Sequence, residues 1–181
     1  MGEIIIKPRR ETEVTDEQLF QLYKDSYQQW QENGLESSWH NFTIEDFGRI
    51  SRLMNSSSVF VALDAGTGEL LGTHTLRANK RTRVVSGSAL AVASKAKHKG
   101  VATRLLLFEE ERARKAGYYC ICEATAIGAE WSVRWHLKNG FLIIGYKHSK
   151  NDNHPSYAFR KQLLPVSLKK PFYSLYSFSF F

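Results

Sequence analysis

The sequence predicts an α+β domain, with a mixed, mostly antiparallel sheet of about seven strands and about four helices packed on it. Three observations support this fold class. Short runs rich in β-branched and aromatic residues, separated by turn residues, indicate strands. Four longer segments repeat apolar residues at helical spacing. In the middle of the chain a strand, a helix and a strand follow one another, which is typical of a parallel pair of strands.

The N-terminal segment predicts one short strand and two helices. Three consecutive isoleucines indicate a strand over residues 3–7. Thr15 and Gln18 have the spacing of a capping box, so a helix is expected from there to the region of Asn33. A second helix is expected over residues 43–54, where Phe42 and Phe47 are placed for a hydrophobic staple.

The rest of the chain predicts six strands and two helices. The strands are expected over 58–64, 70–77, 84–93, 118–125, 141–148 and 156–163, and the helices over 101–117 and 128–139. The strands on either side of the first of these helices are expected to be parallel, because a helical crossover joins parallel neighbours. Over 109–115 three glutamates are followed by three basic residues at i,i+4 spacing, which indicates a solvated helix face.

Length and composition predict one domain over residues 1–164 and a separate tail over 165–181. The chain has 181 residues, of which 43% are hydrophobic, enough for a substantial core. The tail is rich in Phe and Tyr, which are unfavourable when fully exposed to water. Packing on the domain or a homodimer contact is favoured over a membrane interface, since only two lysines support the latter.

The cysteine count and the hydropathy profile favour a cytoplasmic protein. Cys120 and Cys122 lie two apart in an expected strand and therefore on one face, where they make a poor disulfide and lack partners at zinc spacing. No metal site is predicted. No apolar run approaches the roughly 18 residues of a membrane span, and the N-terminus does not resemble a signal peptide. Membrane insertion is therefore not expected.

The sequence predicts an anion cradle where the strand over 84–93 meets the long helix. The loop over 94–100 is basic, and amides at a helix N-terminus bind phosphate. Gly100 allows close approach of the backbone. Neither common phosphate-binding pattern, G-x-x-x-x-G-K-[ST] or G-x-G-x-x-G, is present. The residues expected to bind a phosphate or pyrophosphate are Lys97, His98, Lys99, Gly100, Val101, Ala102 and Thr103.

The cradle resembles the phosphate loop of the GNAT superfamily of acetyl-CoA-dependent N-acetyltransferases, roughly L-x-V-x-P-x-x-[RQ]-x-x-G-x-[GA]. The match runs from Leu90 to Ala102. Ser94 stands where proline is usual, and Lys97 stands where arginine or glutamine is usual. The order and spacing of the remaining positions agree with the pattern.

A second block resembles the family's later motif, roughly N-x-x-A-x-x-x-Y-x-x-x-G-F. It begins at Ala129, which replaces asparagine, and ends at Gly140 and Phe141, which fit the pattern. Ser132 is a small residue in place of alanine, and His136 replaces tyrosine. The chain therefore departs from the family at the residue to which chemistry is most often assigned.

The resemblance implies a GNAT-like fold and an acyltransferase that moves an acetyl group from acetyl-CoA to a primary amine of a small molecule, amino sugar or peptide. Transfer would occur by direct attack in a ternary complex. Ala91 and Val92 are implied to offer backbone amides to pantetheine and the acetyl oxygen. His136 stands where the family's tyrosine is proposed to protonate the thiolate, so it is the candidate acid.

Glu123 is the candidate base. It lies in the strand expected opposite the cradle strand. Tyr119 and Ile121 share its face, a setting expected to raise its pKa. The alternative is that Glu123 is structural and a chain of water molecules removes the proton from the amine.

The resemblance implies that the acceptor region lies between the first two helices. A cationic amine would meet carboxylates and aromatic rings there, although these are also ordinary loop residues. The residues in question are Glu32, Glu36, Trp39 and His40.

Two other functions remain open. Loss of the motif tyrosine and asparagine is consistent with a GNAT-fold protein that binds acyl-CoA without the usual chemistry. Net charge of +7 and aromatic residues such as Phe60, Tyr118 and Tyr119 are consistent with a nucleic-acid-binding module. Stacking platforms require exposed rings, whereas most of these lie in expected apolar strands, so no nucleic-acid partner is predicted.

Overall fold

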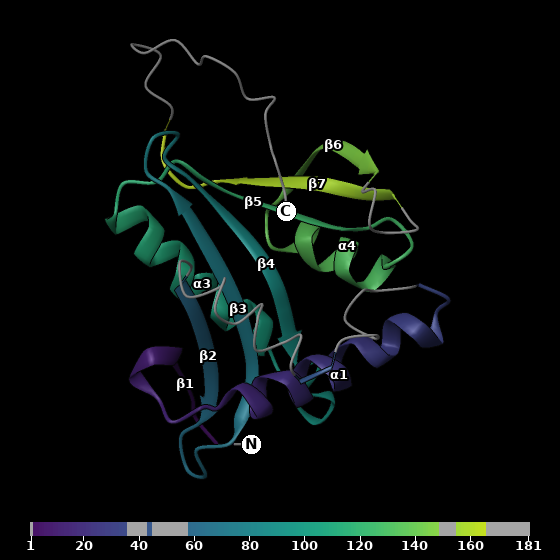
Figure 1. The fold of residues 1–181 in the computed structure, drawn as a ribbon. Coiled ribbons are helices and arrows are strands. Elements are labelled where there is room, and N and C mark those ends of the chain that lie inside the picture. The colour runs from purple at the N-terminus through teal and green to yellow at the C-terminus, as the bar shows by residue number, and fades with distance from the viewer. Residues whose placement is uncertain (1, 36–42, 45–57, 149–154, 166–181) are drawn as a thin grey trace.

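The computed structural model describes residues 2–35, 43–44, 58–148 and 155–165 of the 181-residue chain. Its strands are β1 (Ile4–Pro8), β2 (Ser58–Asp64), β3 (Leu70–Asn79), β4 (Val84–Val92), β5 (Cys120–Ala126), β6 (Leu142–His148) and β7 (Pro155–Gln162). Three α-helices lie in the described ranges: α1 (Asp16–Glu32), α3 (Val101–Lys115) and α4 (Glu130–Lys138). Figure 1 shows their arrangement.

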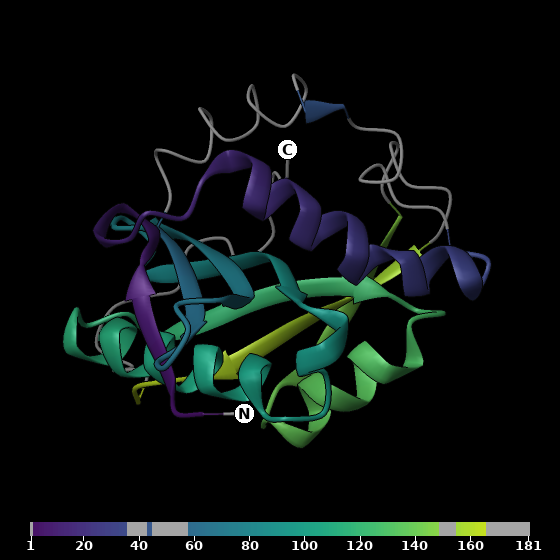
Figure 2. The same ribbon diagram turned by 90° about the horizontal axis from the view of Figure 1, so that it is seen from below.

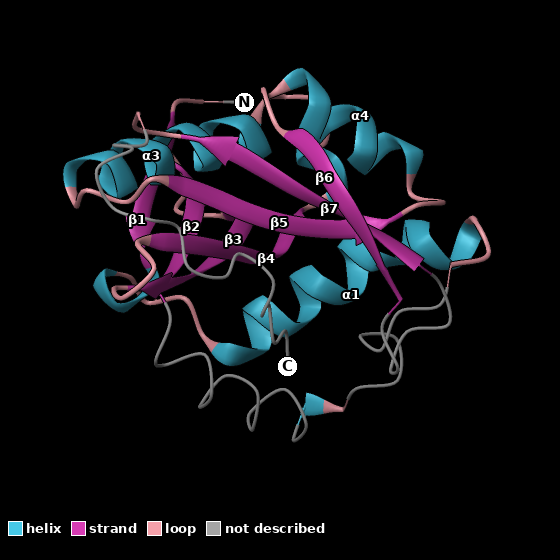
Figure 3. Ribbon diagram, turned by 90° about the horizontal axis from the view of Figure 1, so that it is seen from above, coloured by secondary structure: helices cyan, strands magenta, loops and turns pink. Residues whose placement is uncertain are grey.

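The seven strands form one sheet in the order β1-β2-β3-β4-β5-β7-β6. Only β4 and β5 are parallel, and every other neighbouring pair is antiparallel. Figures 2 and 3 show α1 on one face of the sheet and α3 and α4 on the other. The predicted α+β class with a mixed, mostly antiparallel sheet is confirmed.

The described helices agree with three of the four that the sequence predicts. The fourth, expected over residues 43–54, lies outside the described residues apart from Thr43 and Ile44. Residues 166–181 of the tail also lie outside them. No helix within the described ranges is long and apolar enough to cross a membrane.

Helix α1 begins at the predicted capping box. Thr15 accepts a hydrogen bond from the Gln18 amide (3.2 Å), and the Gln18 side chain accepts one from the Thr15 amide (2.9 Å), so two amides at the helix start are satisfied. Leu19, Leu22 and Tyr23 are buried against the sheet. The helix is therefore fixed along β3 and β4, the strands that it contacts.

Helix α3 buries a stripe that includes Val101, Leu105 and Leu106. Glu109 and Glu110 belong to the same buried stripe, with exposed fractions of 0% and 1%. The prediction of a solvated face over 109–115 is therefore wrong at these two residues. The i,i+4 spacing of acidic and basic residues does not distinguish a carboxylate that faces water from one that faces buried cations, because both kinds of carboxylate satisfy it.

Candidate active site

The two parallel strands separate soon after they pair. Val84, Val85 and Ser86 of β4 lie opposite Cys120, Ile121 and Cys122 of β5, and the pairing stops there. In Figure 1, β4 then continues toward α1 while β5 runs across toward α4. Ala89 on β4 has φ 53°, and the register between β3 and β4 shifts at this point. This bulge turns β4 away from its parallel neighbour.

The predicted cradle lies where the loop after β4 meets the start of α3. The loop after β4 places His98 (φ 61°) and Gly100 (φ 80°) in the left-handed region. Successive residues of this kind turn backbone amides toward a common point. The first intrahelical bond of α3 runs from the Arg104 amide to the Gly100 carbonyl (2.9 Å), so the amides that precede it, of Val101, Ala102 and Thr103, have no partner within the helix.

The predicted basic residues surround this cradle. His98, Lys99 and Arg104 are exposed, and Lys97 is half-buried. Because Gly100 has a positive φ, a side chain there would be strained even though the space beside it is open. The residues present therefore fit a pyrophosphate in both charge and backbone conformation.

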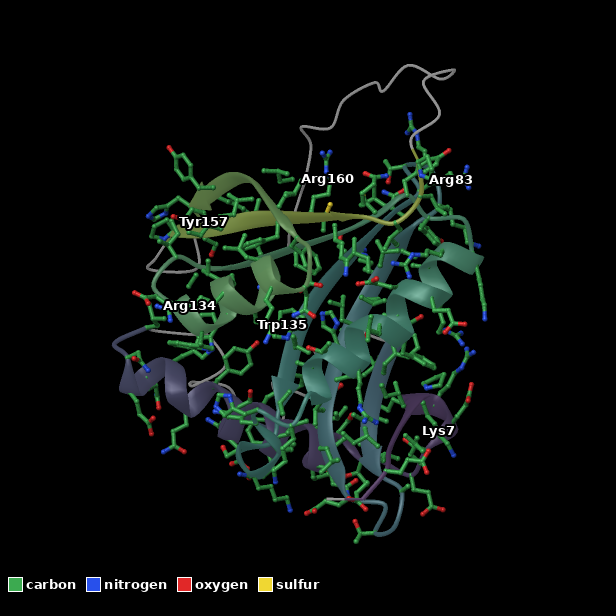
Figure 4. The ribbon with its side chains drawn as sticks, turned by 180° about the vertical axis from the view of Figure 1, so that it is seen from behind. Lys7, Arg83, Arg134, Trp135, Tyr157 and Arg160 are labelled. Atoms are coloured by element: carbon green, nitrogen blue, oxygen red, sulfur yellow. The ribbon has the colours of Figure 1, made fainter. Side chains whose placement is uncertain are left out.

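Trp135 joins α4 to the cradle. Its indole nitrogen donates to the Thr103 hydroxyl at 3.3 Å. Figure 4 shows Trp135 extending from α4 toward the start of α3. This hydrogen bond connects α4 to α3. We call the region where β4 and β5 are no longer paired the opening.

Val92 directs its amide away from β3. The Ala93 amide donates to the Leu71 carbonyl of β3 (2.9 Å), and because amides alternate along a strand, the Val92 amide points to the other side. There it donates to the hydroxyl of Ser26 on α1 (3.3 Å). Ala91, two residues before Ala93, directs its amide toward β3. Sequence patterns gave no sign of Ser26.

His136 and Glu123 are in direct contact beneath the opening. The His136 Nε2 atom lies 3.0 Å from Glu123 Oε2, and its Nδ1 atom lies 2.7 Å from the Ser132 carbonyl oxygen. A carbonyl oxygen only accepts, so Nδ1 carries a hydrogen. The Nε2 contact then requires one further proton, held either by the imidazole or by the carboxyl group. We call these two residues the dyad.

Packing fixes both members of the dyad. The His136 ring stacks on Phe159 (centroids 4.5 Å apart) and meets the edge of Phe141. The Glu123 side chain lies over Gly87 of β4, where an added Cβ would come within 2.9 Å of it. Exposed fractions are 3% for His136 and 5% for Glu123. Gly87 is thus needed to admit the carboxylate at the point where the strands part.

A second buried pair, His74 and Glu109, lies beside the dyad. The His74 Nδ1 atom is 2.7 Å from Glu109 Oε2, and its Nε2 atom is 3.9 Å from Glu123 Oε2. His74 lies in the middle of β3 and is 1% exposed. Glu109 was not recognised from the sequence as a buried residue.

Opposing effects act on these ionisable groups. Burial disfavours the imidazolium of His74, but Glu109 and Glu123 raise its pKa to about 9. Burial raises the pKa of Glu109, although His74 counteracts it. Burial also acts to raise the pKa of Glu123, but His74 and His136 lower it below the ordinary value. The predicted raising of the Glu123 pKa by apolar neighbours is therefore wrong.

Aromatic rings connect the end of α1 to the start of α4. Tyr27 and Trp30 have ring centroids 5.4 Å apart, and Trp30 meets Trp131 edge-on at 6.2 Å. This end of α1 borders the predicted acceptor region. Of the residues named for that region, Glu32 is exposed, whereas Glu36, Trp39 and His40 lie outside the described residues.

A model of the acetyltransferase (GNAT) family matches residues 17–141, which is more than half of the chain. The protein belongs to this family. A search of curated proteins found no match.

Several solved structures have the same GNAT fold. An N-acetyltransferase from Staphylococcus aureus Mu50 has a TM-score of 0.65 at 19% identity, with 90% of this chain and 100% of that chain covered. An aminoglycoside 6'-N-acetyltransferase complexed with coenzyme A has a TM-score of 0.68 at 18% identity, covering 90% and 99%. The ribosomal-protein-S18-alanine N-acetyltransferase from Escherichia coli has a TM-score of 0.68 at 10% identity, covering 94% and 100%.

The GNAT fold of this chain brings the predicted site residues to two places. The seven cradle residues lie together at the start of α3, and His136 and Glu123 meet beneath the opening. Ala91 and Val92 lie between them on β4. Within the described ranges, no group of three or more His, Cys, Asp or Glu side chains is arranged to hold a metal ion.

Proposed function

We propose that this protein transfers the acetyl group of acetyl-CoA to a primary amine of a small molecule, amino sugar or peptide. The observation that supports this most directly is the end of the β4–β5 pairing after Ser86, together with the first amides of α3, which have no partner within the helix. A carrier whose pyrophosphate binds those amides has the opening beside it for its acyl arm. The residues that would hold the pyrophosphate are the seven predicted for the cradle, 97–103.

The Val92 amide is the proposed donor to the acetyl oxygen. An amide that hydrogen-bonds this oxygen stabilises the negative charge that develops on it during attack. In the structure the same amide donates to Ser26. The serine hydroxyl must therefore release the amide when the thioester binds.

The reaction needs two proton transfers. The neutral amine attacks the carbonyl carbon, a C–N bond forms, the C–S bond breaks, and the thiolate takes a proton while the nitrogen loses one. In this proposal the dyad serves both steps: Glu123 receives the proton from the amine, and His136 supplies one to the sulfur. Glu123 Oε1 has no hydrogen-bond partner among the described residues, so it is available to accept. A proton then moves from Glu123 to His136 across the Nε2 contact, which returns the dyad to its starting state.

The experiment is a thermal-shift measurement with acetyl-CoA, followed by thiol-release assays over a panel of amines. We expect stabilisation by acetyl-CoA and thiol release with at least one amine class. Lack of stabilisation, or a cradle that stays empty in crystals grown with acetyl-CoA, would contradict the proposal. Because members of the fold are named for acceptors as different as an aminoglycoside and a ribosomal protein, the panel must include both small and peptide amines.

The second candidate is an acyl-CoA-binding protein without transfer activity. The observation that favours it is the burial of His136, which engages both of its ring nitrogens with protein groups. Stabilisation by acetyl-CoA without thiol release from any amine would support this candidate. Nucleic-acid binding loses one of its suggested stacking platforms, because Phe60 is only 3% exposed.

A further inference from the structure

Four ionisable side chains form a continuous buried row beneath the site. They come from four different elements: Glu109 from α3, His74 from β3, Glu123 from β5 and His136 from α4. Their contacts are 2.7, 3.9 and 3.0 Å in that order. None of the four is more than 5% exposed. The proposed reaction uses only Glu123 and His136. The other two, His74 and Glu109, are here called the inner pair, and burying either of them without its partner would be unfavourable.

The orientation of His74 is decided by its neighbours. Its Nδ1 atom contacts Glu109, and its Nε2 atom has no hydrogen-bond partner among the described residues, with Glu123 as the nearest charged group. The Nδ1 contact takes one hydrogen, and without a second one the Nε2 atom would direct its lone pair at the Glu123 carboxylate 3.9 Å away, so the geometry favours one proton beyond the neutral imidazole and the carboxylate. Whether that proton belongs to His74 or to Glu109, the Nε2 hydrogen faces Glu123. The inner pair therefore presents positive potential to the carboxylate of the dyad.

We propose that His74 and Glu109 are positioning residues for the transfer reaction, which hold a proton next to Glu123 and thereby set the proton affinity of the dyad. The effect of these residues on the rate of transfer rests on the proposed function. Their effect on where the dyad binds its proton does not. A cation beside the dyad lowers the proton affinity of the dyad, and removing the cation raises that affinity.

Other charged groups near the row are few. Lys161 of β7 acts on Glu123 and forms an ion pair with Glu110 of α3. Glu110 also pairs with Arg114 (2.5 Å) and acts on Glu109. From β4, the residue against Glu123 is Gly87, which carries no charge. His74 and His136 both approach the same oxygen of Glu123, Oε2, from β3 and α4.

The test follows the ring nitrogens of His74 and His136 by ¹⁵N NMR over pH in the full chain. We expect the wild-type His74 ring to stay protonated above pH 8, and Glu109→Gln to move its titration downward by about 1 unit or more. In His74→Gln the titration of the dyad, followed on His136, should move upward by about 1 unit. An unchanged dyad titration in His74→Gln would overturn the inference.

Kinetics separate this inference from the proposed function. If thiol release occurs, the acidic limb of the kcat/KM profile should shift upward by about 1 unit in His74→Gln. Ile121→Val, on β5 two residues before Glu123, is the matched control: it removes buried volume but no charge, so it should lower the melting temperature without moving the limb. Wild-type protein without any thiol release would refute the proposed function, while the NMR titrations would still decide the role of His74 and Glu109.

Discussion

His136 and Glu123 share one proton across 3.0 Å while almost completely removed from solvent. At the scale of single residues, this contact makes the proton state of each depend on the other. A carboxylate with a lowered pKa is a weak base in isolation. A carboxylate coupled to an imidazole can accept a proton as the imidazole gives one away, which is the use proposed here.

Replacing His136 by Phe should reduce turnover. The phenyl ring keeps the stacking with Phe159 but removes the proton of the dyad. We expect kcat to fall about 100-fold or more, with the affinity for acetyl-CoA nearly unchanged. Stopped assays of thiol release and calorimetric titration measure the two quantities. His148→Phe, at the exposed end of β6, is the control. Unchanged turnover in His136→Phe would remove the residue from the mechanism.

Ser26→Ala tests the proposed donor. In the free protein the Val92 amide donates to the Ser26 hydroxyl, and the substitution removes this partner. The acetyl oxygen then binds the amide without first displacing a hydroxyl group. A neutral hydrogen bond of this kind contributes about 1 kcal/mol, which corresponds to a gain of about fivefold in affinity for acetyl-CoA. Coenzyme A without the acetyl group is the control ligand and should bind as before. Equal effects on both ligands would show that Ser26 does not compete with the acetyl group.

At the scale of elements, the approach of α3 to the sheet positions the cradle. A Cβ on Gly72 of β3 would lie 2.8 Å from the Val101 side chain, so glycine is needed where the helix begins. Glu110 then pairs with Lys161 of β7 further along the same helix. These contacts hold the N-terminal amides of α3 at the end of β4, independently of any bound ligand.

Gly100→Ala should weaken acetyl-CoA binding. The positive φ at this position is unfavourable for alanine by about 1 kcal/mol, and relief of that strain would rotate the amides at the helix start. Gly68→Ala is a matched control, because Gly68 has a φ of 72° with the same open surroundings but lies in the hairpin between β2 and β3. Both variants should lose similar stability in chemical denaturation. Only Gly100→Ala should raise the Kd for acetyl-CoA, and equal Kd values would contradict the cradle.

At the scale of the whole molecule, the buried row makes stability depend on pH. The His74 pKa is raised from its ordinary value of 6.5 to about 9, so the folded state binds a proton that the unfolded chain has released. The stabilisation from this proton is complete below pH 6.5 and is lost as the pH rises through 9.

We therefore expect the free energy of unfolding of the wild type to fall between pH 6.5 and 9. The loss should be on the order of 2 to 3 kcal/mol, measured by urea denaturation at a series of pH values. In His74→Gln the fall over this window should be largely absent. A wild-type curve that is flat over the same window would show that His74 is not protonated in the folded state.

Strand β6 forms an edge of the sheet and exposes apolar side chains. Leu142 is 66% exposed and Tyr146 is 77% exposed. An apolar edge strand offers unpaired backbone groups to another chain, so we expect concentration-dependent self-association. Tyr146→Lys should weaken it, measured by sedimentation velocity, with the exposed Leu107→Lys on α3 as the control. Sedimentation as a monomer at every concentration would contradict this expectation.

The sequence by itself determined the order of the described elements and the capping of α1, because both depend on local spacing, which hydrogen bonds within a turn or a helix enforce. It also supplied the candidates for the cradle and for the dyad, His136 through the resemblance to the GNAT motif and Glu123 through its place in an expected strand. The tertiary structure decided that Glu109 and Glu110 are buried, that His74 faces Glu123, and that Ser26 holds the Val92 amide. These contacts join residues from different elements, and their chemistry depends on sheet order and burial, which local patterns do not encode.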